Sequence, residues 1–108
     1  MKPEISIVIP AYNEEESRHP LFGSLYPVMT DMGRPFEIIF INDGSKDSTL
    51  GILYDLYVSH PEVRVIDLNG NFGQHMAIMA GFEHVRGDIV ITLDADLQNP
   101  PEEIPNIV

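Results

Sequence analysis

The chain carries, at residues 89–96, the stretch Ile89-Val90-Ile91-Thr92-Leu93-Asp94-Ala95-Asp96. Its first five residues are aliphatic or β-branched, which is typical of a parallel strand that is buried on both faces. Two carboxylates, Asp94 and Asp96, follow this run directly. In parallel α/β sheets, ligands bind outside the carboxyl ends of the strands, so a buried run that ends in acids is a candidate site.

Three more runs of strand length precede this one, and helical patterns separate them. The strand-like runs span residues 5–9, 36–41, 63–66 and 88–93. The helical patterns lie at about residues 21–32, 48–59 and 74–85, with a fourth beginning at residues 100–103. An alternation of strands and helices calls for a parallel sheet with right-handed crossovers. We therefore predict an α/β fold, a Rossmann-like parallel sheet with helices on both faces.

The third helical pattern, residues 74–85, is apolar almost all round. A helix of this kind is expected to be buried on both sides. Met76 and Met79 are accordingly interpreted as core residues that fill gaps.

Composition limits the classes of protein to consider. The chain has 108 residues, enough for one modest domain, and its apolar fraction of 44% supports a packed core. It has 6 basic and 17 acidic side chains, for a formal net charge of −11. Such a chain is a poor partner for nucleic acid or for an anionic lipid surface. It has no cysteine, which excludes disulfides, thiolate metal sites and thiol catalysis.

The segment shows neither a signal peptide nor an apolar run of membrane-spanning length. We expect it to be soluble and cytoplasmic. It stops at Val108, inside what reads as the first turns of a helix, which predicts that it is a fragment of something longer.

Polar residues follow three of the predicted strands. Tyr12, Asn13 and Glu14 come after the first, Asn42 and Asp43 after the second, and Asp94 and Asp96 after the fourth. If the first and fourth strands are neighbours, these groups converge on one crevice.

Asp94, Asp96 and Gln98 stand at alternate positions, so in an extended segment their side chains point the same way. Carboxylate and carboxamide oxygens are the ligands of hard cations such as Mg²⁺ and Mn²⁺. A metal would also allow so acidic a chain to bind a polyphosphate. The alternative for this segment is a solvated loop of acids, and for residues 10–15 and 42–48 it is a polar loop or a turn with a helix cap.

Other nucleotide-binding and signalling patterns fit less well. Neither a GxGxxG fingerprint nor a P-loop is present. A phosphorylation-switched receiver domain has similar length and strand order, and residues 93–97 mimic its phosphoacceptor strand. Receivers, however, expect an acidic pair directly after the first strand and a late lysine, whereas no lysine follows Lys46.

Taken together, the motifs resemble the family 2 glycosyltransferases of the GT-A fold, in the branch that transfers sugars to polyprenyl phosphates. The segments that carry the resemblance are residues 7–15, 41–49, 72–82 and 87–103. The resemblance implies that residues 1–108 are the N-terminal nucleotide-sugar-binding part of a GT-A domain, and that the C-terminal acceptor part is absent.

The resemblance also implies roles for individual residues. The nucleoside pocket would be lined by Pro10, Ala11, Tyr12, Glu14 and Asp43, with Ala95 against the ribose or phosphate. Asp94, Asp96 and Gln98 would surround a Mg²⁺ or Mn²⁺ ion that bridges the diphosphate, which makes Asp94 and Asp96 the catalytic pair. Gly70 stands where close relatives often carry a basic residue, which speaks against a phosphate contact from that loop.

The implied reaction is inverting transfer of a sugar from a nucleotide diphosphate, with UDP favoured, to a polyprenyl phosphate such as undecaprenyl phosphate. The acceptor phosphate is already an anion at neutral pH, so it needs no strong general base. The full-length protein is expected at the cytoplasmic face of the inner membrane. Residues 1–108 alone are expected to be inactive, and exposed apolar edges of the fourth strand would favour a homo-oligomer or a partner surface.

Overall fold

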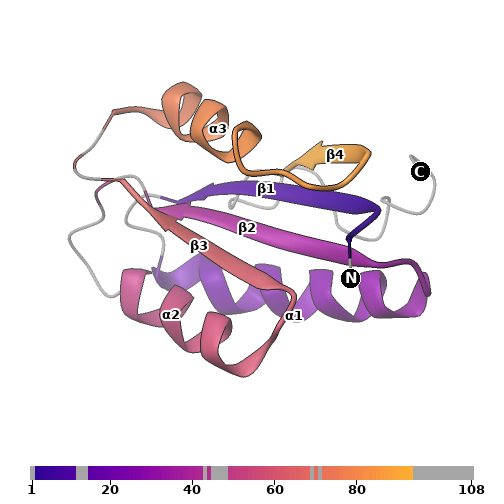
Figure 1. Ribbon diagram of the computed structural model, residues 1–108. Coiled ribbons are helices and arrows are strands. Elements are labelled where there is room, and N and C mark those ends of the chain that lie inside the picture. The colour runs from indigo at the N-terminus through magenta and orange to yellow at the C-terminus, as the bar shows by residue number, and fades with distance from the viewer. Residues whose placement is uncertain are drawn as a thin grey trace.

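The computed structural model of the chain describes residues 2–11, 15–42, 44, 49–68, 70 and 72–93 (Figure 1). Within these ranges the elements are β1 (Ile5–Ala11), α1 (Glu15–Asp31), β2 (Phe36–Asn42), α2 (Thr49–Ser59), β3 (Val63–Asp67), α3 (Gln74–Phe82) and β4 (Ile89–Thr92). All three strand pairs are parallel, and the strand order is β3-β2-β1-β4. The predicted α/β Rossmann-like fold is confirmed, and β1 and β4 are neighbours, which is the condition for convergence of the polar strand ends. The helix predicted to begin at residues 100–103 lies outside the described residues.

Strand β1 continues two residues past its predicted end, through Pro10 to Ala11. The N–H of Leu93 donates to the carbonyl of Val8 (3.1 Å), so the main-chain groups of Val8 face β4. Main-chain groups alternate sides along a strand, so those of Pro10, two residues after Val8, also face β4. Proline has no N–H, and the hydrogen bond that it cannot make is therefore one to β4 rather than to β2. Pairing with β4 ends at Val8, whereas pairing with β2 runs on to Ala11. The proline therefore limits one ladder and leaves the other intact.

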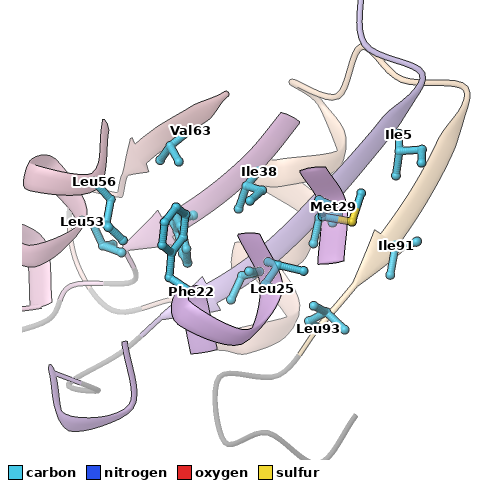
Figure 2. Close-up of a cluster of buried hydrophobic side chains, with 13 residues drawn as sticks. Ile5, Phe22, Leu25, Met29, Ile38, Leu53, Leu56, Val63, Ile91 and Leu93 are labelled. Atoms are coloured by element: carbon cyan, nitrogen blue, oxygen red, sulfur yellow. The ribbon is translucent and has the colours of Figure 1, made fainter. Parts of the chain in front are cut away.

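Helices α1 and α2 cover one face of the sheet and build the larger core (Figure 2). Its buried members are Ile5, Ile7, Ile9, Phe22, Leu25, Met29, Ile38, Phe40, Leu53, Leu56, Val63, Ile91 and Leu93. Among the side chains of α1 that the structure describes, residues 22–31, the buried apolar ones are Phe22, Leu25 and Met29, and the helix begins at Glu15 rather than at about residue 21. Burying each large apolar side chain contributes about 1.5–3 kcal/mol, so this face supplies most of the stability of the described fold.

Helix α3 alone covers the other face in the described structure, and it touches the sheet through small residues (Figure 1). Ala77 packs with Val8, Ile39 and Ile41. A Cβ added at Gly81 would lie only 2.6 Å from Val8 Cγ1, so the helix approaches the strands closely.

The outward side of α3 corrects the prediction of a helix buried on both sides. Met76 and Met79 are 55% and 49% exposed, so they are not core residues among the described part of the chain, and the helix ends at Phe82 rather than Val85. The apolar composition was read correctly, but none of the described residues covers this side. No helix in the described ranges combines the length and the hydropathy needed to cross a bilayer.

A buried carboxylate fastens the amino edge of the sheet. Glu37 of β2 is 1% exposed and accepts hydrogen bonds from Ser6 Oγ (2.6 Å), Arg64 Nη1 (2.8 Å), and both the main-chain N (2.8 Å) and Nε (3.1 Å) of Arg86. Gly87 N donates in turn to Ser6 Oγ (2.8 Å). Burial raises the pKa of Glu37, but these hydrogen bonds to its charged form outweigh burial and hold the pKa below its usual value. The network ties the segment before β4 to β1 and β2, which helps to set where β4 begins.

Candidate active site

The carboxyl ends of the strands meet at one edge of the sheet, and three of them supply the start of a predicted site segment. Ala11 lies opposite Asn42 in the β1–β2 pair, and Asn42 lies opposite Asp67 in the β2–β3 pair. On the other side of β1, Thr92 lies opposite Val8. The chain therefore leaves β1, β2 and β4 at the same edge of the sheet, with β4 ending opposite a residue three positions before the end of β1. The adjacency of β1 and β4 meets the condition under which the sequence analysis expected the polar residues to converge.

Of the predicted nucleotide-binding residues, Pro10 and Ala11 belong to the described structure. Pro10 is buried within β1, and Ala11 is the last residue of that strand. The other predicted site residues lie outside the described residues: Tyr12, Glu14, Asp43, Asp94, Ala95, Asp96 and Gln98. Their roles stay predictions, and what the structure gives is the place from which each segment starts.

The start of the acidic segment is well anchored. Leu93 is 4% exposed, packs in the larger core and donates its N–H to Val8 (3.1 Å). Asp94 is the next residue in the sequence, so the acidic pair begins one residue after a buried, hydrogen-bonded position. The donor set of two carboxylates and a carboxamide has the chemistry that Mg²⁺ and Mn²⁺ prefer. In the described ranges, no cluster of three His, Asp or Glu side chains offers an alternative metal site.

A polar pair that the sequence did not reveal joins β2 to β3 at this edge. Asn42, 2% exposed, donates from Nδ2 to Asp67 Oδ1 (2.9 Å), and the Leu68 N–H donates to the Asn42 carbonyl (2.9 Å). Gly44, two residues on, has a φ of 72°, a left-handed value that glycine adopts without strain. Asn42 was noted as a polar strand end, but Asp67 was not expected to matter. The only sequence signal was an acid at the end of the third strand, and the register is what places it beside Asn42.

A hollow of about 330 Å³ lies at the opposite, amino edge, lined among others by Arg34, Glu37 and Arg86. Its arginines are already paired, Arg34 with Glu4 and Arg86 with Glu37. Its other acid, Glu62, accepts a hydrogen bond from Tyr26 Oη (3.1 Å). Pairing leaves little charge to recognise a ligand, so we place the candidate site at the carboxyl edge instead.

A parallel sheet with the strand order β3-β2-β1-β4 defines the chain as a Rossmann-like α/β protein. Residues 6–108 match the model of glycosyl transferase family 2, and the chain belongs to this family. It is 54% identical over 106 residues to the undecaprenyl-phosphate 4-deoxy-4-formamido-L-arabinose transferase of Shewanella sediminis (strain HAW-EB3), a match that covers 96% of this chain and 32% of the relative. The chain thus spans about a third of the length of the curated relatives it matches. Family membership leaves the receiver-domain alternative without support.

Solved structures share the fold. The mannosyltransferase PcManGT from Pyrobaculum calidifontis, solved in complex with GDP-Man and Mn²⁺, superposes with a TM-score of 0.69 at 23% identity over 89% of this chain and 28% of that one. S. aureus TarS 1-349 in complex with UDP-GlcNAc gives a TM-score of 0.68 at 24% identity over 86% of this chain and 26% of that one. At these identities the likeness supports the fold, and the predicted GT-A type of Rossmann-like sheet agrees with it.

Proposed function

We propose that residues 1–108 form the nucleotide-sugar-binding part of an inverting glycosyltransferase that moves a sugar from a nucleotide diphosphate to a polyprenyl phosphate. The single observation that carries this proposal is that the β1, β2 and β4 segments leave the sheet at the same, carboxyl edge. Family membership supports the reaction class, and the name of the Shewanella relative supports undecaprenyl phosphate as acceptor and 4-deoxy-4-formamido-L-arabinose as the sugar. We favour UDP as the nucleotide because the resemblance is to bacterial enzymes that use UDP-sugars.

The proposed division of labour follows the strand order. The nucleoside is bound by the segments after β1 and β2, namely Pro10, Ala11, Tyr12, Glu14 and Asp43, with Ala95 of the β4 segment against the ribose or phosphate. On the β4 side, Asp94, Asp96 and Gln98 hold Mg²⁺ or Mn²⁺. When bound, the metal neutralises charge that develops on the leaving diphosphate. A fold neighbour solved in complex with GDP-Man and Mn²⁺ supports a divalent ion as cofactor.

The acceptor does not need a strong base from this chain. A polyprenyl phosphate is ionised at neutral pH and attacks as an anion, so the remaining requirements are orientation and the departure of the diphosphate. Because the chain spans about a third of its curated relatives, we assign acceptor binding to segments outside residues 1–108, and the whole protein to the cytoplasmic face of the inner membrane. Residues 1–108 alone should then bind nucleotide without forming product, and any enzyme-dependent glycolipid from a labelled sugar nucleotide would contradict this.

Calorimetric titration of UDP into the 108-residue chain, with Mn²⁺ and with EDTA, tests the proposal. We expect binding that requires the metal and that weakens at least about 100-fold, or about 2.7 kcal/mol, in the double variant Asp94→Ala, Asp96→Ala. The matched control is Asp31→Ala, Asp55→Ala, which removes two acids from exposed positions on α1 and α2. Absence of UDP binding in a folded sample, or equal binding in EDTA, would contradict the assignment.

A further inference from the structure

The Asn42–Asp67 pair stands directly before a residue that the proposed function places at the nucleoside. Asn42 is the last residue of β2, and Asp43 follows it in the sequence. Two hydrogen bonds tie this strand end to the end of β3: Asn42 Nδ2 to Asp67 Oδ1 (2.9 Å) and Leu68 N to the Asn42 carbonyl (2.9 Å). One link uses the side chain and the other uses the main chain of the same residue.

The side-chain link fixes the orientation of a buried group. Asn42 is 2% exposed, and a buried carboxamide must find partners to offset its desolvation. Asp67 is exposed at the edge, and its ionised carboxylate only accepts hydrogen bonds. It therefore selects the amide nitrogen, and a bond to a charged acceptor is stronger than one between neutral groups. Removing Asp67 leaves the orientation of this carboxamide less restrained.

The strand order separates what this pair can influence from what it cannot. Strands β2 and β3 lie on one side of β1, and β4 lies on the other. The acidic segment after β4 is anchored independently, through Leu93 and Val8. A substitution in the Asn42–Asp67 pair should therefore weaken binding of the nucleoside more than binding of the diphosphate.

We propose that Asn42 and Asp67 are a positioning pair that holds the exit of β2 and thereby supports nucleoside binding by the segment that follows this strand. The inference rests on the proposed function and deepens it, because it assigns a role in nucleoside affinity to two residues outside the expected motif. Neither residue needs to touch the ligand: Asp67 acts through Asn42, and Asn42 acts through the backbone that leads to Asp43.

The test compares two ligands across matched variants of the 108-residue chain. Dissociation constants for UDP and for inorganic pyrophosphate, both with Mg²⁺, are measured by calorimetry. For Asp67→Ala we expect UDP binding to weaken about tenfold, the value of one hydrogen bond of about 1.4 kcal/mol, with pyrophosphate binding unchanged within about twofold. Asp67→Asn keeps an acceptor oxygen but loses the charge, so its UDP affinity should lie between those of Asp67→Ala and the original chain. Asp55→Ala, which removes an exposed acid from α2, is the charge control.

A reversal of the pair provides an independent check. Asn42→Asp places two carboxylates side by side and should weaken UDP binding at neutral pH at least as much as Asp67→Ala. Adding Asp67→Asn to it restores one donor and one acceptor in the opposite order, and should recover most of the UDP affinity. Thermal unfolding of each variant establishes that the samples are folded, and if Asp67→Ala fails to fold, Asn42→Asp with and without Asp67→Asn supplies the same comparison.

The outcomes separate this inference from the function beneath it. If the original chain binds UDP and Asp67→Ala binds it equally well, the positioning role is wrong and the nucleotide site stands. If Asp67→Ala weakens UDP and pyrophosphate equally, the pair is merely structural and the inference is also overturned. If the folded original chain binds no UDP, the proposed function is contradicted, and so is the positioning role that rests on it.

Discussion

The two edges of the sheet are both polar, yet they are organised in opposite ways. At the amino edge, Glu37 is buried and accepts four hydrogen bonds from groups on three other segments of the chain. At the carboxyl edge, the described polar contact between strand ends is the Asn42–Asp67 pair, half of which is exposed. At the amino edge, the polar groups around Glu37 hydrogen-bond to one another. At the carboxyl edge, the strands end and lead into the segments that contain the candidate site residues.

This difference suggests a division between stability and binding. A closed network at the amino edge fixes the start of β4 relative to β1 and β2, and so fixes the far ends of the same strands where the site segments begin. The hollow at the amino edge is lined by paired charges, which fits a structural role. Changes at the amino edge should therefore alter unfolding more than ligand binding, and changes at the carboxyl edge should do the reverse.

The largest expected effect on stability comes from Glu37→Ala. The change leaves Ser6, Arg64 and Arg86 without their shared acceptor, and breaking a buried pair costs about 3–5 kcal/mol. Both arginines are partly exposed and can return to water, which places the expected loss near the lower limit, at about 3 kcal/mol. Urea unfolding measures it. Glu37→Gln, which retains an acceptor, should cost less, and a UDP affinity that fell while stability stayed the same would break the proposed division.

The next effect is steric and concerns Gly87, at the end of the same network. A Cβ at this position would lie 2.8 Å from Ser6 N and 2.9 Å from Glu4 O, which are backbone atoms that cannot rotate away. Gly87→Ala should destabilise the fold by about 2 kcal/mol, within the range for an overpacked site. The control is Gly51→Ala on α2, where a new Cβ meets nothing within 4 Å and the better helix propensity should add up to about 1 kcal/mol. Equal unfolding midpoints for the two variants would show that the close approach at the amino edge does not matter.

A smaller effect should follow pH. Because the folded-state pKa of Glu37 is lowered from its ordinary value of 4.5, its ionised form stabilises the fold fully above that value. The contribution is lost as pH falls through the folded pKa. Unfolding curves of the original chain and of Glu37→Gln, recorded between pH 7 and pH 3, isolate this residue from the other acids. The stability difference between the two proteins should shrink below about pH 4.5, and a difference that grew on acidification would show that the sign assigned here is wrong.

The contrast between the edges also explains which features the sequence could predict. Strand-length apolar runs and helical periodicity are local, so they predicted the parallel sheet and the element order, whereas the adjacency of β1 and β4 comes from the structure. The hydrogen-bond partners of Glu37 lie 27 to 49 residues away in the chain, and Asn42 and Asp67 are 25 residues apart. Such pairs follow from register, which no local pattern encodes.

Helix α3 shows a second limit of sequence reading. Its apolar composition predicted a helix at residues 74–85, of which 74–82 are helical, but it did not predict which side would be covered. Ala77 and Gly81 touch the sheet because they are small, while Met76 and Met79 point outward. Hydropathy identifies apolar residues but does not say which other residues pack against them. None of the described residues packs over the outward side of α3. For the candidate site, the sequence motifs predicted which residues to expect, and the fold showed that the segments carrying them start at the carboxyl edge of the sheet.

The smallest expected effect on stability comes from Asp67→Ala at the carboxyl edge, the counterpart of Glu37→Ala. Each change removes one carboxylate, but Asp67 is exposed and accepts one described hydrogen bond, from Asn42, whereas Glu37 is buried and accepts four. A loss of no more than about 1 kcal/mol is expected, close to the value of a single hydrogen bond. Urea unfolding beside Glu37→Ala gives the comparison directly. If Asp67→Ala cost as much as Glu37→Ala, the carboxyl edge would be as structural as the amino edge. A small loss combined with weaker UDP binding would instead place the Asn42–Asp67 pair on the binding side of the division.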